Sequence, residues 1–186
     1  EKLTYQQLLD AGVHFGHLRK KWNPKMAPYI FMEKKGIHLI DLNKTLASLE
    51  EAANALKQIA RSGKRILFVA TKKQAKDLVA EAAKSVNMPY VTERWLGGML
   101  TNFSTIRKSI KKMQSIDKML SDESFEGLTK KERLTLSREK LKMEKVLAGI
   151  AQLGRTPNAI FVVDVSHEHI ALAESNKLNM VTFGMV

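Results

Sequence analysis

Two pairs of histidines have the spacing that could first suggest a metal site. His14 and His17 are separated by two residues, and His167 and His169 by one. Imidazole nitrogens bind zinc and other transition metals, but neither pair is accompanied by the further ligands of a structural site. The chain has no cysteine, which excludes thiolate sites and disulfides. We therefore treat His14 and His17 as weak metal candidates, expect the histidines to donate to backbone or phosphate, and expect no cofactor.

The phosphate loops of nucleotide enzymes are missing from the places where an α/β enzyme carries them. Gly63-Lys64-Arg65 precedes an apolar run instead of following it, and Thr71-Lys72-Lys73 follows that run where a Gly-x-Gly-x-x-Gly would be expected. Asp164 ends another apolar run, but no base or nucleophile is paired with it, so we interpret it as a cap of the turn at Ser166. The sequence predicts no enzyme. The alternative is an RNA- or nucleotide-processing enzyme on a doubly wound α/β fold.

Cations interleaved with aromatic rings give a stronger signal. The formal net charge is +12 and the sequence pI is about 9.9, which favours an anionic partner, either nucleic acid or an acidic membrane surface. Residues 13–29 contain two prolines and no regular period, so we predict an ordered loop. Its cations can neutralise phosphates, while its rings either stack on unpaired bases or pin the loop to the core. The RNA-binding candidates here are Arg19, Lys20, Lys21, Trp22 and Lys25.

Residues 94–102, Arg-Trp-Leu-Gly-Gly-Met-Leu-Thr-Asn, join a sheet-like pattern to a helical one. The glycine pair permits a close turn. Its four large apolar residues are predicted to pack the base of the following helices on the sheet, which makes the stretch a fixed corner. The remaining RNA-binding candidates lie at this corner and on the next helix: Arg94, Asn102, Arg107, Lys108, Lys111 and Lys112.

Apolar patterning predicts a parallel sheet. The run 66–70 is continuous, as in a strand buried on both faces, 160–165 is the most strand-like segment, and 90–92 is a shorter strand. Thr71-Lys72-Lys73-Gln74 has capping-box spacing and predicts a helix between two of these strands. Strand, helix and strand in this order indicate a parallel crossover. Residues 30–40 predict an antiparallel β-hairpin with a glycine-containing turn.

Two long amphipathic helices are predicted over 102–120 and from 129 to a stop at Gly154. The apolar residues of the first are Phe103, Ile106, Ile110, Met113, Ile116 and Leu120. In the second, Thr129 and Glu132 have capping-box spacing, and a heptad repeat is accompanied by other apolar residues. The repeat is Leu134, Leu141 and Ala148, and the accompanying residues are Leu136, Met143, Val146, Leu147 and Ile150. With a break over 121–128, this pattern predicts an antiparallel helical hairpin. The expected organisation is an α/β domain of residues 1–101 and 155–186, interrupted by a projecting hairpin of residues 102–154.

No apolar run approaches the ~20 residues that span a bilayer. The first residues show neither a secretory core nor an Arg-rich transit pattern, so we expect no export. The final residues, 179–186, read as an apolar strand, which an open parallel sheet normally follows with a helix. We therefore expect the chain to continue beyond Val186.

Five motifs carry a family resemblance. They are Gly-Val-His-Phe-Gly-His at 12–17, Trp-Asn-Pro-Lys-Met at 22–26, residues 94–102, Leu-Thr-Lys-Lys-Glu at 128–132 and His-Glu-His-Ile-Ala at 167–171. Together and in this order they resemble the bacterial small-subunit ribosomal protein two family over nearly the whole chain. Each motif alone is weak, but their joint occurrence is specific. The family normally continues into an Asp-Thr-Asn-Ser turn and a last helix, which this sequence lacks.

The resemblance implies a flavodoxin-like three-layer α/β/α domain with a parallel sheet and an inserted coiled-coil hairpin. It also implies a structural role in the cytoplasmic ribosome, where the protein would bind ribosomal RNA between the head and body of the small subunit. Members join late in assembly and help to dock the messenger-binding ribosomal protein one. The expected partners are therefore small-subunit RNA and neighbouring ribosomal proteins, with no membrane and no homo-oligomer. The RNA contacts assigned above by charge and position are hypotheses within that expectation.

Overall fold

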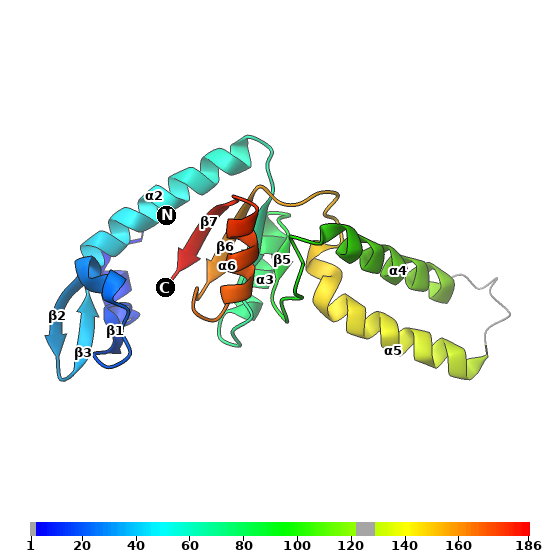
Figure 1. The fold of residues 1–186 in the computed structure, drawn as a ribbon, viewed down its shortest axis with the longest axis horizontal. Helices are drawn as coiled ribbons and strands as arrows, with labels where there is room; N and C mark the ends of the chain where they lie inside the picture. The colour runs from blue at the N-terminus through cyan, green and yellow to red at the C-terminus, as the bar shows by residue number, and fades with distance from the viewer. Residues whose placement is uncertain (1–2, 122–128) are drawn as a thin grey trace. The chain divides into compact units, whose positions relative to one another are not determined.

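The computed structural model describes residues 3–121 and 129–186. It contains two compact units, Glu1–Gln58 and Ile59–Val186, and the boundary between them falls in the last turn of a long helix, α2 (Figure 1). Of the break predicted between the two long helices, residues 122–128 lie outside the described residues. None of the described helices is long and apolar enough to cross a membrane.

The first unit combines short helices with a three-stranded antiparallel sheet in the order β1-β3-β2. Its elements are α1 (Tyr5–Asp10), β1 (Phe15–Leu18), the 3-10 helix η1 (Pro24–Tyr29), β2 (Ile30–Lys34), β3 (Ile37–Ile40) and α2 (Leu42–Arg61). The predicted hairpin of β2 and β3 is confirmed. Its turn residues Lys35 and Gly36 have φ of 52° and 76°, the positive values that a two-residue turn matching the strand twist requires.

The prediction of one ordered loop over 13–29 is wrong, because β1 and η1 lie within it. β1 has no alternating apolar pattern, and it is a strand because it pairs with β3. Gly16 permits this pairing: a Cβ there would lie 2.9 Å from the carbonyl oxygen of His38. Pairing with β3, and not the local sequence pattern, therefore makes residues 15–18 a strand.

The second unit is built on a four-stranded parallel sheet in the order β5-β4-β6-β7. The strands are β4 (Ile66–Val69), β5 (Tyr90–Val91), β6 (Ala159–Val163) and β7 (Val181–Met185), and the crossover helices are α3 (Lys76–Ser85) and α6 (His169–Lys177). The connections run in opposite directions from the central strands, so right-handed crossovers place α3 and α6 on opposite faces. The predicted three-layer α/β/α fold is confirmed.

Helix α3 begins later than the sequence predicts. Its first residue is Lys76, and Ala75 before it makes no side-chain cap. The predicted capping box at Thr71 is wrong, because the backbone N–H and the hydroxyl of Thr71 both donate to Glu168. The inward side of α3 is set by Ala83, the buried residue of the helix, whereas the larger Leu78 is 70% exposed.

The predicted antiparallel helical hairpin consists of α4 (Phe103–Ser121), which leads away from the sheet, and α5 (Lys130–Leu147), which returns to it and continues as the 3-10 helix η2 (Ala148–Ile150) (Figure 1). The capping box of Thr129 and Glu132 is confirmed. The inward side of α4 is as predicted, with four buried apolar residues, Ile106, Ile110, Met113 and Ile116.

The predicted heptad seam of α5 is wrong. Leu134 and Leu141 are 53% and 62% exposed. The seam instead follows the equally spaced Leu136, Met143 and Ile150, which are half-buried or buried. Both series have a period of seven, and contact with α4 selects the second one.

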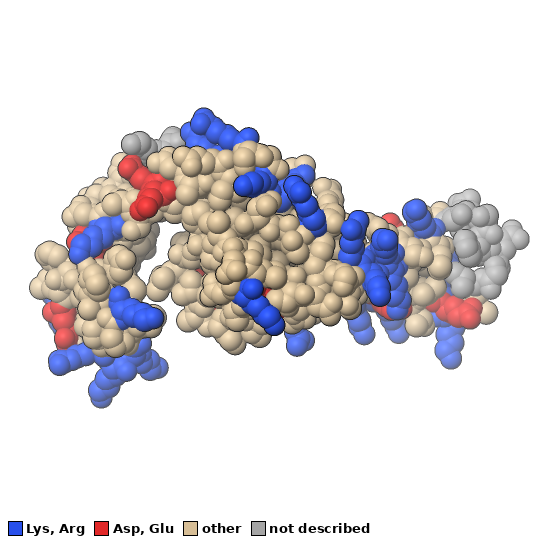
Figure 2. Space-filling model, turned by 45° about the horizontal axis from the view of Figure 1, so that its top comes forward, with Lys and Arg blue, Asp and Glu red and all other residues tan. Residues whose placement is uncertain are grey.

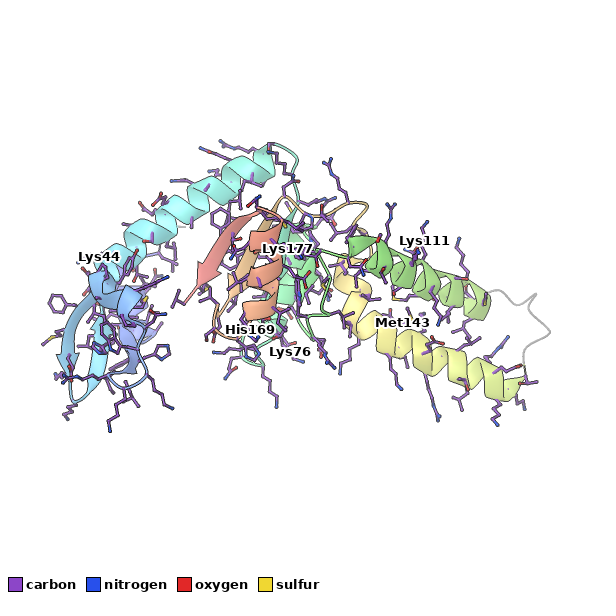
Figure 3. All side chains as sticks on the ribbon, in the orientation of Figure 1. Lys44, Lys76, Lys111, Met143, His169 and Lys177 are labelled. Atoms are coloured by element: carbon purple, nitrogen blue, oxygen red, sulfur yellow. The ribbon has the colours of Figure 1, made fainter. Side chains whose placement is uncertain are left out.

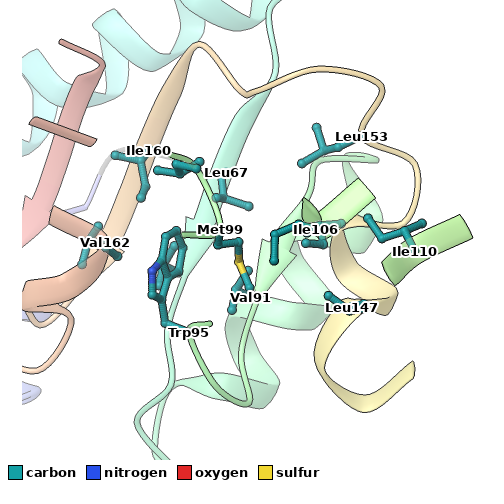
Figure 4. Close-up of a cluster of buried hydrophobic side chains, with 14 of the residues drawn as sticks. Leu67, Val91, Trp95, Met99, Ile106, Ile110, Leu147, Leu153, Ile160 and Val162 are labelled. Carbon is teal, nitrogen blue, oxygen red and sulfur yellow. The ribbon is translucent and has the colours of Figure 1, made fainter. Parts of the chain in front are cut away.

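One hydrophobic core joins the sheet to the base of the hairpin (Figure 4). Leu67 and Ile160 come from the strands, Trp95 and Met99 from the loop between β5 and α4, and Ile106 from the hairpin; all are at most 8% exposed. Residues 94–102 therefore pack the hairpin on the sheet, as predicted. The domain bounds at 102 and 154 stay a prediction.

The close approach of η2 to β5 gives a test of this packing. A Cβ on Gly149 would lie 2.1 Å from the carbonyl oxygen of Tyr90, whereas a Cβ on Gly154 would meet nothing within 4 Å. We expect Gly149→Ala to lower the free energy of unfolding by about 2 kcal/mol or more. Gly154→Ala, its control, should leave that free energy unchanged or raise it by up to about 1 kcal/mol. Chemical denaturation of both variants checks this, and equal effects would contradict the close packing.

Candidate nucleic-acid interface

The carboxylate of Glu174 in α6 organises the loop from which the hairpin starts. Its Oε1 accepts hydrogen bonds from the Trp95 indole N–H at 3.1 Å and from the Gly98 backbone N–H at 2.7 Å. Its Oε2 accepts from the backbone N–H groups of Leu100 and Thr101 and from the Thr101 hydroxyl, all at 3.0 Å. Five donors from one loop therefore converge on a carboxylate from another element, with 73 to 79 residues between the partners.

Glu174 is ionised in this setting although it is 8% exposed. Burial acts to raise the pKa of its carboxyl group, because it removes the charged form from water. The hydrogen bonds donated by Thr101, Trp95, Leu100 and Gly98 act in the opposite direction and together outweigh burial, so the pKa lies below its ordinary value. The loop is thus tied to a buried charge.

The backbone of the loop also needs Gly98, which has φ of +84°. The Gly98 carbonyl accepts a hydrogen bond from the Asn102 backbone N–H at 2.8 Å, directly before α4. The Asn102 side-chain oxygen accepts from the Thr105 hydroxyl at 2.9 Å in the first turn of that helix. Arg94 and Asn102 both lie on the surface, so the fixed loop presents these two predicted RNA-binding residues to solvent.

The four predicted cations of α4 extend this surface. Arg107, Lys108, Lys111 and Lys112 are all exposed, on the sides of α4 away from its buried stripe. Lys112 also pairs with Glu139 of α5 at 2.5 Å. Figure 3 labels the exposed Lys111 of α4 and the half-buried Met143 of α5, and Figure 2 shows Lys and Arg side chains along the visible face of the hairpin.

The other predicted group belongs to the first unit. Arg19, Lys20, Lys21 and Lys25 are exposed, and Arg19 lies 3.6 Å from a carboxylate oxygen of Glu33. Trp22 is half-buried and stacks on His38, with ring centroids 4.8 Å apart and an interplanar angle of 28°. The ring of Trp22 thus packs within its own unit, and a contact between this ring and RNA stays a prediction.

The carboxyl ends of β4 and β6 carry polar side chains that bind one another. The Glu168 carboxylate accepts from the backbone N–H of Thr71 at 2.8 Å, and Lys72 pairs with Asp164. The remaining oxygen of Asp164 accepts from the Ser166 backbone and hydroxyl, which confirms that it caps this turn. Lys72 and then Ser166 hold the pKa of Asp164 well below its usual range. Doubly wound folds commonly bind ligands at this edge, but here the protein's own carboxylates occupy its donors.

The histidine pair does not converge on one point. The His14 ring contacts the Phe15 ring at a tilt of 37°, with centroids 4.1 Å apart, while His17 is exposed on β1. Across residues 3–121 and 129–186, no group of three or more His, Cys, Asp or Glu side chains is placed to hold a metal ion.

Glu174 and Glu168 were missed at the level of sequence. Glu168 lies within the His-Glu-His-Ile-Ala motif at 167–171, but that motif does not name its partner, and Glu174 belongs to no short motif. The partners of both carboxylates are more than 70 residues away. The one usable signal is Glu174 itself, an acidic residue in a helix rich in small and apolar side chains, where a buried charge implies a partner.

Comparison of the chain with known proteins identifies its family. Residues 8–186 match the ribosomal protein S2 family. The chain belongs to that family. It is 68% identical over 186 residues to the small ribosomal subunit protein uS2 of Cytophaga hutchinsonii and 60% identical over 185 residues to that of Parabacteroides distasonis. All of this chain is aligned in both cases, and it spans 73% and 66% of the respective relatives.

Membership in the family settles the class of function. Ribosomal protein S2 is a structural component of the small ribosomal subunit in the bacterial cytoplasm, so the chain is a structural protein and not an enzyme. The alternative of an RNA- or nucleotide-processing enzyme is therefore wrong. The internal pairing at the carboxyl edge of the sheet agrees with this, since the groups that would hold a nucleotide phosphate are bound to Glu168 and Asp164.

Replacing the anchoring carboxylate tests the corner. Glu174→Gln keeps the shape of the side chain but removes its charge. The new side-chain NH2 group cannot accept a hydrogen bond, so donors of the loop would lose their acceptor. At pH 7 we expect the free energy of unfolding to fall by about 2–4 kcal/mol. Trp95 fluorescence in a Trp22→Phe background reports on the unit directly, and Glu81→Gln, at an exposed position on α3, is the control.

The pH dependence of this difference follows from the direction of the shift. The folded pKa of Glu174 is below its unfolded value of about 4.3, so its stabilisation is fully present above that value and is lost as the pH falls through the folded pKa. The difference between Glu174→Gln and the parent should therefore be largest above about pH 5 and shrink below about pH 4. A difference that does not change with pH would contradict an ionised anchor.

Proposed function

We propose that the chain binds ribosomal RNA between the head and body of the small subunit through two basic surfaces. The arm surface consists of Arg19, Lys20, Lys21, Trp22 and Lys25 in the first unit. The hairpin surface consists of Arg94, Asn102, Arg107, Lys108, Lys111 and Lys112 in the second unit. The chain also helps to dock the messenger-binding ribosomal protein one, and it acts as a single copy beside neighbouring small-subunit proteins.

The observation that carries the RNA proposal is the density of outward cations at the start of α4. Four of the six residues from Arg107 to Lys112 are cationic and exposed, and the first carboxylate of the helix is Asp117. Cations neutralise phosphates and release the counterions condensed on RNA, which makes such a face favourable for a phosphate backbone.

The pair between Lys112 and Glu139 does not weaken this proposal. Both side chains are substantially exposed, at 60% and 39%, so the pair adds little to stability. A phosphate can then replace Glu139 as the partner of Lys112 at small cost. Before RNA binds, Glu139 holds this lysine beside α5.

The fixed corner supports the same proposal. A long basic hairpin contributes more to affinity when its direction is set before binding, because ordering it during binding costs free energy. The contacts of Glu174 with residues 95–101 and the shared core supply that direction. The place between head and body and the docking of ribosomal protein one rest on the family resemblance.

Replacing Lys108, Lys111 and Lys112 together with alanine tests the hairpin surface. We expect the affinity for small-subunit RNA to fall about tenfold. The slope of log affinity against log salt concentration should become shallower by an amount that corresponds to roughly two to three phosphate contacts. The melting temperature should stay nearly unchanged, since exposed charges add little to stability. The matched control replaces the same lysines with arginine, which should restore most of the affinity because the charge is kept.

Sedimentation provides the test in the assembled particle. The parent chain should co-migrate with small ribosomal subunits after a moderate-salt wash, and the triple alanine variant should do so less. If the parent chain does not co-migrate with the subunits, the proposed function is contradicted. A large melting loss with normal incorporation would instead mean that the lysines form a packing face.

A further inference from the structure

A basic pocket lies at the amino ends of β4 and β5, the edge opposite to the one where doubly wound folds commonly bind ligands. Arg65 directly precedes β4, Lys84 belongs to the last turn of α3, Tyr90 begins β5, and Gln152 follows η2. The pocket has a volume of about 290 Å³. Ligand sites commonly enclose about 300–1,000 Å³, so this one suits a ligand of the size of a single nucleotide.

The walls of the pocket are held in place by contacts of its own lining. The guanidinium of Arg65 donates to the backbone carbonyl of Asn87, which joins the strand entrance to the end of α3. On the other side, Gly149 of η2 packs so closely on Tyr90 that no side chain fits between them. A preformed site of this kind loses little freedom when a ligand enters.

The chemistry of the lining is that of a nucleotide site. Two cations, Arg65 and Lys84, border it, and none of its lining residues is acidic. The amide side chains of Asn87 and Gln152 can each donate and accept a hydrogen bond, as the edge of a base requires. Apolar surface is provided by residues that include Tyr90 and Leu153.

The position of Lys84 strengthens this assignment. Its ammonium group lies 5.6 Å from the centroid of the Tyr90 ring, a cation–π arrangement that keeps the charge at the pocket. A site for phosphate alone would need the cations but not the apolar surface and the amides. A site for an apolar ligand would not need the cations. A nucleotide uses all three kinds of group.

We propose that this pocket holds one unpaired nucleotide of an RNA strand, with the phosphate at Arg65 and Lys84 and the base edge at Gln152. The proposal deepens the proposed function and rests on it, since the RNA of the small subunit would supply the nucleotide. An unpaired nucleotide is required because the bases of a duplex are stacked and paired and cannot enter a pocket of this size.

Filling the pocket provides the main test. Ala148 lines it and is exposed, so Ala148→Phe should occupy the space without removing a cation. Fluorescence anisotropy at one fixed salt concentration compares a single-stranded RNA octamer with a duplex of the same sequence. We expect Ala148→Phe to weaken octamer binding at least fivefold and duplex binding less than twofold.

Two further variants guard against a folding artefact. Gln152→Ala removes one amide and should weaken octamer binding about threefold, and Lys84→Gln should do so three- to tenfold. Lys64→Gln is the matched control for charge, because Lys64 is exposed beside Arg65 but does not line the pocket. It should change octamer and duplex binding equally and by less than twofold. Circular dichroism melting confirms that each variant is folded.

The outcomes separate the pocket from the proposed function. If Ala148→Phe and Gln152→Ala leave octamer binding within twofold of the parent while duplex binding persists, the pocket proposal is overturned alone. If the parent binds neither form of RNA, both proposals are overturned. Competition with free uridine monophosphate distinguishes an RNA strand from a free nucleotide as the ligand. If the monophosphate displaces the octamer only at millimolar concentration, the result supports an RNA strand. If it competes at the same concentration as unlabelled octamer, the proposal of an RNA strand is overturned in favour of a free nucleotide.

Discussion

The second unit depends on one buried carboxylate. Glu174 and the loop 94–102 each carry groups that would be costly to bury alone, because an unpaired carboxylate and unpaired backbone N–H groups both lose their hydration. Their five hydrogen bonds satisfy both at once. Trp95 can then enter the core with its indole N–H paired, and Met99 and Leu100 follow it there. The direction in which the chain leaves the sheet for α4 is a consequence of this arrangement.

Glu168, the residue directly before α6, supplies a second carboxylate that acts in the same way. Glu168 accepts from Thr71 at the turn after β4, where a nucleotide-binding relative of this fold would offer its N–H groups to a phosphate. Two loops that could bind external anions are therefore held by Glu174 of α6 and by Glu168 directly before that helix. The fold class is compatible both with a sheet that binds a ligand at this edge and with one that only supports other elements. Here the two glutamates already accept the hydrogen bonds of the loops, so the sheet supports other elements, in agreement with membership in a structural ribosomal family.

Sequence reasoning succeeded where the determinants are local. The capping box at Thr129 and the hairpin turn at Lys35 and Gly36 are set by residues a few positions apart, and the parallel crossover follows from the order of strand, helix and strand. The same capping pattern failed at Thr71, because a glutamate 97 residues away takes its donors. The candidate cations are exposed, but charge and spacing alone do not identify the buried carboxylate that positions their helix.

The phase of the hairpin seam shows a related limit. The series through Leu134 and the series through Leu136 have the same period, so periodicity on α5 does not distinguish them. The partner helix does, because Met143 of α5 packs against the core that contains Ile110 and Met113 of α4. The pairs of Lys112 with Glu139 and of Lys140 with Asp117, each at 2.5 Å, also link the two helices. The pairing of α4 with α5 therefore fixes which leucines turn inward. The sequence pattern of one helix alone does not contain this information.

These pairs also explain how a protein with many acidic residues presents a basic surface. Helices α4 and α5 contain four carboxylates, and three of them have structural tasks: Asp117 and Glu139 join the helices, and Glu132 caps α5. In the core of the unit, Glu168 and Glu174 are turned inward. Negative charge is thus used to fix the fold, while most of the positive charge faces solvent. The contacts that direct the hairpin therefore leave its cations available to an anionic partner, in keeping with the net charge of +12.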